Sequence, residues 1–413
     1  MSKGTTYKLQ IGPTHPAFKE PVRFEFEVDG EQVIQADIDM GYTHRGIEKI
    51  ALSRSFIQII YLVERICGIC SFSHPMAYCL AIENAAEIEV PPRAKYIRTI
   101  IGELERLHSH LLWAGVAAKE IGFDTFFHYT WKIREKAMDC LELITGNRVN
   151  YAMLTIGGVR RDIREEQMPA LQKTVEYYSE LYDRASEILL DDMSLRLRCE
   201  GVGILTYDEA VDLCAVGPTA RASGLAKDVR ADYPIGAYPD IGWFKPVTPA
   251  DMGREPVGDV YDRFTVRVLE MKQSIDIINF CIENMPEGDI SVEPRANRMI
   301  NSLKKLTCEG IGRYEAPRGE VAHYHILDKR EGPVCSKIKA PTYANAITWI
   351  PMFKNTEIAD IPIVMASIDP CVACADRMSI VKKGKRSLVD YSELRRMSIE
   401  KMKRIQGNKG VQR

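Results

Sequence analysis

The spacing of apolar residues along the chain first follows the period of a β-strand and then that of a helix. In VRFEFEVDG (22–30) and EQVIQADIDM (31–40) apolar and polar side chains alternate, and Asp29-Gly30 between them is typical of a hairpin turn. From Ser53 the apolar residues recur every three or four positions, which predicts a helix that runs up to Cys67.

Further helices follow from the same period. Pro91-Pro92 opens a long one, and another begins near Thr130 and stops at Gly146, a residue that commonly ends helices. Segments 168–190, 207–216 and 259–285 also predict helices, residues 217–224 and 233–249 predict Gly/Pro-rich loops, and residues 311–327 and 361–368 predict strands.

These elements predict a mainly α (α+β) fold, with a central bundle of long helices and a small N-terminal antiparallel β portion. We expect four parts along the chain: the β portion (1–50), a helical body (51–300), a mixed β and loop segment that closes the active site (301–377), and a basic C-terminal tail (378–413). The chemistry described below requires the two ends to meet, so that cysteine pairs from both lie in the buried core.

Composition places the chain among ordinary globular proteins. Its 413 residues are 46% hydrophobic and 27% charged, enough for a sizeable core and too apolar for a disordered chain. The sequence contains no run of ~18–20 apolar residues of the kind that spans a membrane. Its start, MSKGTTYKLQ, has no apolar stretch typical of a secretory signal. These features predict a soluble, cytoplasmic chain.

The charge is distributed unevenly. The net charge is −2, but residues 378–413 contain 11 Lys/Arg against 3 Asp/Glu, so this tail carries +8 and the rest −10. Such a tail is typical of a solvated surface helix, or of a segment that binds an acidic partner, an anionic membrane surface or nucleic acid. The aromatic residues do not alternate with the basic ones in a way that suggests a base-stacking platform, which disfavours nucleic acid.

Eleven cysteines in a chain with no secretory signal indicate reduced thiols. Seven stand singly, mostly in apolar patterns, and are expected to be small buried residues. The other four form two pairs, Cys67-Gly-Ile-Cys70 and Cys371-Val-Ala-Cys374. Two intervening residues let both sulfurs of a pair point at one soft metal ion. One pair alone also suits thiol redox chemistry, whereas two pairs favour zinc, an iron–sulfur cluster or nickel–iron.

The spacing between the pairs helps to choose among these metals. Zinc ribbons place their pairs within a few tens of residues, but here 300 residues separate Cys70 from Cys371. A structural zinc ion that links the two ends stays an alternative. A buried metal site formed by both cysteine pairs fits a large enzyme better. Arg65, His74 and Asp369 flank the pairs and are either groups that tune the thiolates or ordinary surface charges.

The motifs around these pairs resemble a known family. RICGICSFSH (65–74) and DPCVACADR (369–377) resemble the metal-binding motifs of the large, catalytic subunit of [NiFe] hydrogenases. Several of the remaining motifs also resemble the quinone-site large subunit of respiratory complex I, a relative that lacks the four cysteines. The segments that resemble the energy-converting, membrane-bound (group 4) branch are GPTHPA (12–17), GYTHRGIEKI (41–50), GNRVNY (146–151), GGVRRD (157–162), GPTARASG (217–224) and YEAPRGE (314–320).

The resemblance implies a role for each cysteine. Cys67 and Cys371 would be terminal ligands of nickel. Cys70 and Cys374 would bridge the nickel to an iron that carries cyanide and carbon monoxide.

It also implies roles for the residues nearby. Pro317 and Arg318 would lie beside the cofactor, with the guanidinium over the open edge of the nickel and Asp369 orienting it. Glu20 matches a carboxylate that exchanges protons with the thiolates. His74 would hydrogen-bond a bridging sulfur, and Glu48 matches a ligand of a second metal, Mg²⁺ or Fe²⁺.

Physical chemistry agrees with these roles. Heterolysis of hydrogen needs a soft, electron-rich metal pair and a nearby base, and a thiolate can be that base if a titratable group such as Glu20 carries the proton away. A guanidinium that never loses its proton suits an electrostatic wall over a vacant position. The alternatives are that Glu20 is an exposed acid at a strand end and that Arg318 forms a structural ion pair.

The resemblance implies 2H⁺ + 2e⁻ ⇌ H₂ as the reaction, with ferredoxin as electron donor. No third cysteine cluster is left for an electron relay, so a small subunit with a [4Fe-4S] cluster is expected as partner, together with antiporter-like membrane subunits that move H⁺ or Na⁺. The chain would lie peripherally on the cytoplasmic face of the membrane. The alternatives are a sulfane-sulfur or quinone reductase subunit of a complex I-like assembly, and a zinc-stapled scaffold subunit. We expect no nucleic acid partner.

Two features depart from the family pattern. Many large subunits have His three residues after the last cysteine, where this chain has Arg377, which puts a His-dependent second metal site in doubt. A 36-residue tail follows, and in the family a comparable tail is removed by a protease after nickel insertion.

Overall fold

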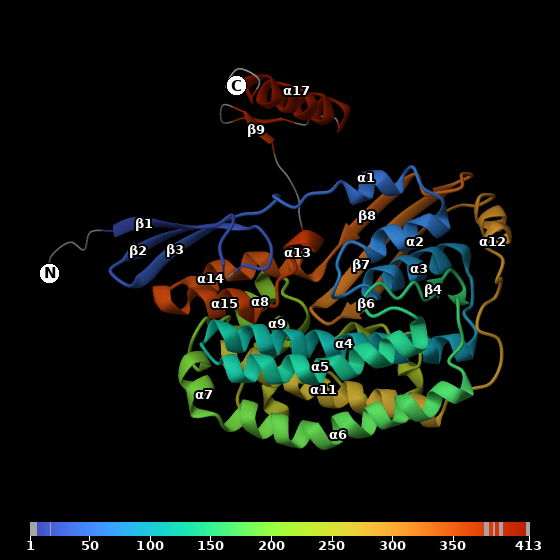
Figure 1. Cartoon of the computed structure of the whole chain (residues 1–413), viewed down its shortest axis with the longest axis horizontal. Helices are drawn as coiled ribbons and strands as arrows, with labels where there is room; N and C mark the ends of the chain where they lie inside the picture. Colours follow the sequence, from blue (N-terminus) through green and yellow to red (C-terminus); the bar gives the residue numbers. More distant parts are fainter. Residues whose placement is uncertain (1–5, 17, 376–379, 383–384, 388–390, 410–413) are drawn as a thin grey trace.

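Four long helices form the body of the protein. The computed structural model describes residues 6–16, 18–375, 380–382, 385–387 and 391–409. Within this part of the chain, α4 packs against both α5 and α11, and α6 also packs against both (Figure 1). The four helices are α4 (Pro92–Glu120), α5 (Asp124–Thr145), α6 (Met168–Asp191) and α11 (Val260–Glu283). The predicted bundle of long helices is confirmed.

Local sequence explains where these helices begin and end. Pro92 occupies the first turn of α4, where a missing N–H costs no hydrogen bond. Gly146 ends α5 in the left-handed conformation, at φ +85°, as its sequence position predicted. However, α5 begins at Asp124, before the predicted start near Thr130, because Phe126 is already buried in the core.

The N-terminal β portion is also confirmed as a three-stranded antiparallel sheet, in the order β1 (Thr6–Ile11), β2 (Arg23–Asp29), β3 (Gln32–Asp39). Phe24 and Phe26 on β2 are fully buried, and their rings lie 5.2 and 5.0 Å from those of Trp349 and Phe353. The alternating apolar face therefore packs on a helix that comes three hundred residues later in the chain.

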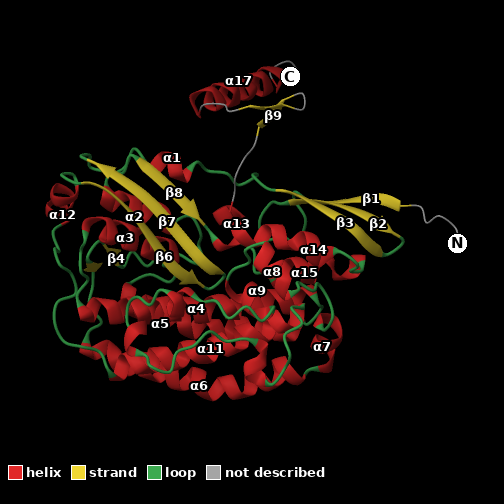
Figure 2. Ribbon diagram, turned by 180° about the vertical axis from the view of Figure 1, so that it is seen from behind, coloured by secondary structure: helices red, strands yellow, loops and turns green. Residues whose placement is uncertain are grey.

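A second antiparallel sheet stands above the bundle, in the order β6 (Thr307–Ala316), β7 (Gly319–Asp328), β8 (Cys335–Lys339) (Figure 2). One of its faces packs on α3 (Ser73–Ala86), a helix that the sequence analysis missed. The approach is close: a Cβ on Gly310 or Gly312 would lie 2.2 or 2.0 Å from carbonyl oxygens of α3. Glycine is therefore required at both positions.

Two predictions of local structure are wrong. Residues 361–368 do not form a strand, because Ile361–Ser367 is the helix α15, with Pro362 in its first turn. A short apolar run does not distinguish a strand from a buried helix by its period. Residues 217–224 are not wholly a loop, since Gly217–Ala222 forms the short helix α9.

The remaining elements are short. They are α1 (Ile47–Ala51), α2 (Phe56–Glu64), β4 (Leu154–Thr155), β5 (Gly158–Val159), α7 (Met193–Cys199), α8 (Tyr207–Asp212), α10 (Val229–Asp232), α12 (Ala296–Leu303), α13 (Pro341–Asn345), α14 (Trp349–Phe353) and α16 (Val372–Ala375).

Backbone hydrogen bonds join the N-terminal sheet to the C-terminal part of the body. The N–H of Val33 donates to the carbonyl of Thr356, and the N–H of Asn355 donates to the carbonyl of Val33, each at 2.9 Å. These bonds fix the chain shortly before it reaches the second cysteine pair, so the fold brings both ends together.

The tail contains β9 (Ile380–Lys382), β10 (Lys385–Ser387) and α17 (Tyr391–Lys409), and Figure 1 draws α17 apart from the body. Arg377, which the sequence analysis singled out, lies outside the described residues. None of the helices in the described part of the chain combines the length and the apolar character that crossing a membrane requires.

Candidate metal centre

Four cysteines from opposite ends of the chain meet in the core. Cys67 and Cys70 lie in the turn between α2 and α3, while Cys371 and Cys374 lie at the start of α16 and within it. The Sγ atom of Cys371 is 3.4 Å from that of Cys67 and 2.6 Å from that of Cys374. All four are free thiols and only 4–6% exposed. The predicted meeting of the two pairs in the buried core is confirmed.

Two overlapping groups of ligand atoms lie within this four-cysteine cluster. The sulfurs of Cys67, Cys371 and Cys374 are all within 4.8 Å of one another, and so are those of Cys70 and Cys374 with a ring nitrogen of His74. Cys374 belongs to both groups. The cluster can therefore hold two adjacent metal ions that share a ligand.

The surrounding chain positions the sulfurs and tunes them. The Sγ atom of Cys67 accepts hydrogen bonds from the N–H groups of Ile69 (3.3 Å) and Cys70 (3.4 Å). Hydrogen bonds from the other three thiols, Cys371 foremost, hold the pKa of Cys67 well below its usual range. Burial raises the pKa of Cys374. Cys67 is therefore the sulfur best prepared to be a thiolate.

Arg318 reaches the cluster from the turn between β6 and β7. Its Nε donates to the carbonyl of Asp369 at 2.7 Å, and its Nη2 donates to the Oδ1 atom of Asp369 at 2.8 Å. Nη1 lies 3.3 Å from the Oγ atom of Ser109. Burial alone would lower the pKa of Arg318, but Asp369 and the neighbouring thiols raise it, so the buried guanidinium stays charged. The structure thus brings Arg318 and Asp369 together as a buried ion pair, and the role of the guanidinium beside a metal stays a prediction.

Asp369 has a strained backbone and one unsatisfied oxygen. Its φ is +54°, a conformation that costs free energy in a residue other than glycine. Its side chain is fully buried, and Oδ2 has no hydrogen-bond partner among the described residues. A buried carboxylate oxygen without a partner is costly, and here it lies two residues before Cys371.

Glu20 is half-buried beside the second cysteine pair. Its Oε2 atom accepts a hydrogen bond from the N–H of Ala373 at 2.9 Å, and it lines a cavity of about 40 Å³ together with Pro370 and Val372. Burial raises the pKa of Glu20, and the negative charge on Cys67 adds to the effect. The carboxyl group thus lies beside the segment that carries Cys371 and Cys374, and its role in proton exchange stays a prediction.

His74 lies beside Cys70 and Cys374 and is fully buried. Its Nδ1 is 3.2 Å from the Nε2 of His323 on β7, and burial lowers its pKa to about 4. A neutral ring within 4.8 Å of the sulfurs of Cys70 and Cys374 is placed to interact with them.

Glu48 lies in a cavity next to the cluster. Its Oε1 atom accepts a hydrogen bond from the N–H of Ile338 at 2.9 Å, and its Oε2 atom is 3.7 Å from the Nζ of Lys337. A cavity of about 220 Å³ is lined by both Glu48 and Cys374. No group of three potential ligand side chains that includes Glu48 occurs among the described residues.

Sequence reasoning missed the role of Arg45, although it noted the motif around it. The guanidinium donates to the carbonyls of Arg65 (2.9 Å) and Ile66 (2.7 Å), just before Cys67. It also donates to the carbonyl of Ala373 at 3.0 Å. Arg45 thus ties the two cysteine segments together, whereas Arg65, which the sequence analysis singled out, is largely exposed.

A second group that was missed lies in the middle of α4. Glu105 accepts hydrogen bonds from the N–H of Phe72 and the hydroxyl of Ser73, and so holds the first turn of α3. Arg106 and Ser109 belong to the same buried stretch. The sequence contained a signal: residues 103–110 (ELERLHSH) place charged and titratable side chains around the whole circumference of a helix whose neighbours are apolar.

The donor set fits a soft, thiolate-bound metal centre. Four buried sulfurs from two turns suit nickel, iron or zinc, and they disfavour magnesium or calcium, which prefer oxygen ligands. Cys67, Cys70, Cys371 and Cys374 would be the ligands.

Two family models match the chain. Residues 120–377 match the model described as "Respiratory-chain NADH dehydrogenase, 49 Kd subunit", and residues 45–114 match the model described as "Nickel-dependent hydrogenase". Each of the two segments includes a part of the four-cysteine cluster.

Individual relatives cover most of the chain. The membrane-bound hydrogenase subunit alpha of Pyrococcus furiosus is 47% identical over 97% of this chain and 94% of its own length. Formate hydrogenlyase subunit 5 of Escherichia coli is 36% identical over 95% of this chain and 67% of its own length. Among solved structures, a chain of the membrane-bound sulfane sulfur reductase, an archaeal respiratory membrane complex, superposes with a TM-score of 0.82 at 29% identity. That match covers 91% of this chain and 100% of the other.

Proposed function

The chain belongs to the family of large subunits of membrane-bound [NiFe] hydrogenases, which is related to the 49 kDa subunit of respiratory complex I, and from this membership we propose that it is the catalytic subunit of an energy-converting hydrogenase. The reaction would be the reversible reduction of protons to H₂. The observation that supports it most directly is the four-cysteine cluster, in which Cys374 belongs to both groups of ligand atoms.

The cysteines would hold a nickel–iron centre whose iron carries cyanide and carbon monoxide. Cys67 and Cys371 would be terminal ligands of nickel, and Cys70 and Cys374 would bridge the two metals. When bound, such a centre supplies the soft, electron-rich site at which the H–H bond forms or breaks. The sharing of Cys374 between the two groups supports its bridging role.

The chain's own residues would handle the proton and shape the vacant side of the site. A terminal cysteine sulfur such as that of Cys67 accepts or releases the proton, and the half-buried Glu20 passes it on. Arg318, held by Asp369, places a permanent positive charge and a steric wall beside the sulfurs. His74 would orient a bridging sulfur, and Glu48 would help to bind a second metal, Mg²⁺ or Fe²⁺, in the adjacent cavity.

The partners follow from the same family membership. Homologues are subunits of membrane-bound respiratory complexes, so membrane subunits are expected beside this chain. Electrons would come from ferredoxin through an iron–sulfur small subunit, since all four clustered cysteines are used by one centre. Antiporter-like subunits would couple the reaction to transport of H⁺ or Na⁺, and the chain would lie on the cytoplasmic face of the membrane.

A second candidate function is reduction of sulfane sulfur. The superposition on the sulfane sulfur reductase favours it, because that chain is matched over its whole length. The higher identity to the membrane-bound hydrogenase of Pyrococcus furiosus favours hydrogen chemistry. A quinone reductase is disfavoured by the intact cysteine pairs, and a zinc-stapled scaffold predicts zinc as the bound metal.

The test is metal analysis of the purified native complex combined with an activity assay. Equimolar nickel and iron, infrared bands from cyanide and carbon monoxide, and H₂ evolution support the proposal. Nickel-free protein that reduces polysulfide supports the reductase, and zinc alone supports the scaffold. Cys374→Ser should abolish nickel binding and H₂ evolution, whereas Cys281→Ser, a buried cysteine on α11 outside the cluster, should retain both.

The basic tail (378–413) is proposed to be an extension that a protease removes after metal insertion. An intact-mass measurement of the subunit from the metal-loaded complex checks this: a mass that ends near Arg377 supports removal, and a full-length mass contradicts it.

A further inference from the structure

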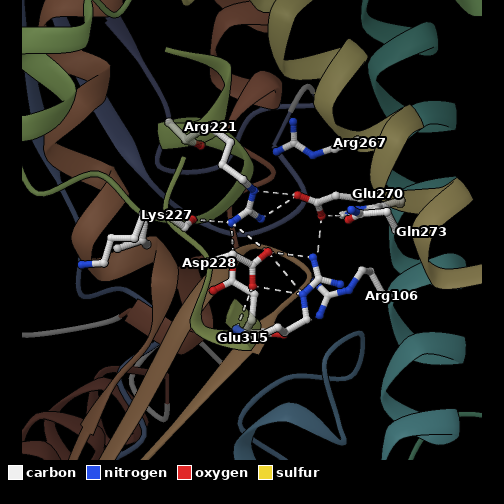
Figure 3. Close-up of polar contacts among 12 residues, drawn as sticks. Arg106, Arg221, Lys227, Asp228, Arg267, Glu270, Gln273 and Glu315 are labelled. Atoms are coloured by element: carbon white, nitrogen blue, oxygen red, sulfur yellow. Dashed lines mark hydrogen bonds and ion pairs between the residues drawn. The ribbon is translucent and has the colours of Figure 1, made fainter. Parts of the chain in front are cut away.

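A network of buried ion pairs lies directly behind the turn that carries Arg318. Its side chains are at most 2% exposed, and they link α4, α9, α10, α11 and β6 (Figure 3). The members of this buried ion network are Glu103, Arg106, Arg221, Asp228, Arg230, Glu270 and Glu315. The reaction proposed above uses none of them.

Arg106 is the member that holds the backbone of the turn. Its Nη2 donates to the carbonyl of Glu315 at 2.6 Å, and its Nη1 donates to the carbonyl of Ala316 at 3.2 Å. These are the last two residues of β6, and Pro317 and Arg318 follow directly. One planar guanidinium on the central helix of the bundle therefore fixes two consecutive carbonyls.

The side chain of Glu315 is held as firmly as its backbone. Its Oε1 atom lies 2.9 Å from Nη1 of Arg221, and its Oε2 atom accepts from the N–H of Val229 at 3.2 Å. Arg221 in turn pairs with Glu270 of α11 at 2.6 Å. Figure 3 shows Arg221 between Glu270 and the pair of Asp228 and Glu315.

The other side of the turn is held by the start of α9. Gly217 and Gly319 are in van der Waals contact, since a Cβ on Gly217 would lie 2.3 Å from the Cα of Gly319. Arg221 lies on the same helix, one turn further along, so α9 contacts the turn at one end and enters the network at the other. The Pro317-Arg318 turn is thus enclosed between α4 and α9.

Buried ion pairs add little stability compared with apolar residues of similar volume, because desolvation offsets their attraction. What these ion pairs contribute is geometry, because each of their hydrogen bonds has a fixed direction and so fixes the positions of the groups it joins. We propose that Arg106 is a positioning residue that fixes the Pro317-Arg318 turn, and with it the place of the Arg318 guanidinium beside the four-cysteine cluster. This inference rests on the proposed function only for its catalytic readout.

The test compares Arg106→Lys with Arg98→Lys in the complete complex. Arg98 is a matched control: it lies on the same helix, is equally buried, pairs with Glu83 at 2.7 Å and donates to the carbonyls of Thr155 and Gly158, with no contact to the turn. Lysine keeps the charge in both variants but loses the second donor group. Both variants should lose thermal stability.

The catalytic readout is kcat at unchanged nickel content. Misplacement of a group by about 1 Å costs on the order of 10- to 100-fold in rate, so we expect a fall of that order in Arg106→Lys and less than a twofold change in Arg98→Lys. In an Arg318→Lys background, Arg106→Lys should have no further effect on kcat, because it acts through Arg318. Equal effects in the two single variants, or effects of Arg106→Lys and Arg318→Lys that multiply, would overturn the inference.

Hydrogen–deuterium exchange gives a readout that needs no activity. The peptide that covers residues 315–320 should exchange at least tenfold faster in Arg106→Lys and at the wild-type rate in Arg98→Lys; unchanged exchange in both would overturn the inference. If Arg106→Lys does not fold, Arg106→Gln, which keeps one donor group in place of the two that bind the carbonyls of Glu315 and Ala316, takes its place. Absence of H₂ turnover in the wild-type complex would contradict the proposed function, whereas the exchange measurement would still test the positioning role of Arg106.

Discussion

At Glu105, burial and hydrogen bonding have opposite effects on the pKa of the carboxyl group: burial raises it and the hydrogen bonds lower it. The carboxyl group is fully buried in α4 and accepts from the N–H of Phe72 at 2.5 Å and from the hydroxyl of Ser73. Burial raises its pKa to about 8 in spite of these two donors. The group that holds the chain just after Cys70 is therefore protonated in the folded protein near neutral pH.

We therefore expect the stability of Glu105→Gln, relative to that of the wild type, to increase as the pH rises. The folded pKa of about 8 lies above the value of about 4.3 for an unfolded chain. Between these values the folded state holds a proton that the unfolded state has lost, so wild-type stability falls with rising pH. Glutamine does not titrate. Melting temperatures of both forms at pH 5 and pH 8 check this, and a constant difference would contradict it.

At the scale of elements, the contact between α3 and β6 connects two parts of the site. α3 begins three residues after Cys70, and β6 leads into Arg318. The two elements touch through Gly310 and Gly312, whose missing side chains let the strand lie against the backbone of the helix. The distance between the cysteines and the guanidinium thus depends on this close packing.

Gly312→Ala should separate the two elements. The added Cβ would lie 2.0 Å from the carbonyl oxygen of Ala77 and 2.5 Å from the N of Ala81. Overpacking of this kind costs about 1–3 kcal/mol, which would appear as a lower melting temperature and lower H₂ evolution. Gly242→Ala is the control, because no atom lies within 4 Å of its added Cβ. Wild-type behaviour of both variants would refute the role of the glycine contact.

At the scale of the whole molecule, the site exists because the chain closes on itself. Phe24 and Phe26 anchor the N-terminal sheet on α14, and the backbone bonds at Val33 continue that contact. Arg45 completes the closure at the cluster by bonding to both cysteine segments. Nothing in the local sequence around either pair requires this meeting.

Arg45→Met should therefore loosen the hold on the metals and leave the fold intact. Groups that orient metal ligands typically contribute about 10- to 100-fold to metal affinity. Under the proposed function, nickel should therefore be lost to a chelator roughly tenfold or more faster than from the wild type. Arg65→Met is the control, since its side chain is 57% exposed. The rate of metal release, measured by elemental analysis, checks the prediction. Equal rates for the two variants would exclude the proposed role of Arg45 in linking the two cysteine segments.

Local sequence already determined much of the fold. The alternating residues of β2, the proline that opens α4 and the glycine that ends α5 lie where the pattern predicted them, because these signals act through neighbours in the chain. The two Cys-x-x-Cys pairs and their flanking motifs likewise indicated the family, and they marked the four candidate ligands, whose role stays a prediction. Helix α15 was misjudged, because a short buried apolar run carries no period that distinguishes helix from strand.

Tertiary structure alone decided what surrounds the ligands. The contacts of Arg45, Glu105 and Arg106 with the site join residues that are tens to hundreds of positions apart, so no local pattern encodes them. A buried charge is tolerated only where the fold supplies its partner, and that partner is chosen by packing. The sequence therefore determined which four sulfurs are the candidate metal ligands, and the fold determined how far apart they lie and which charged groups face them.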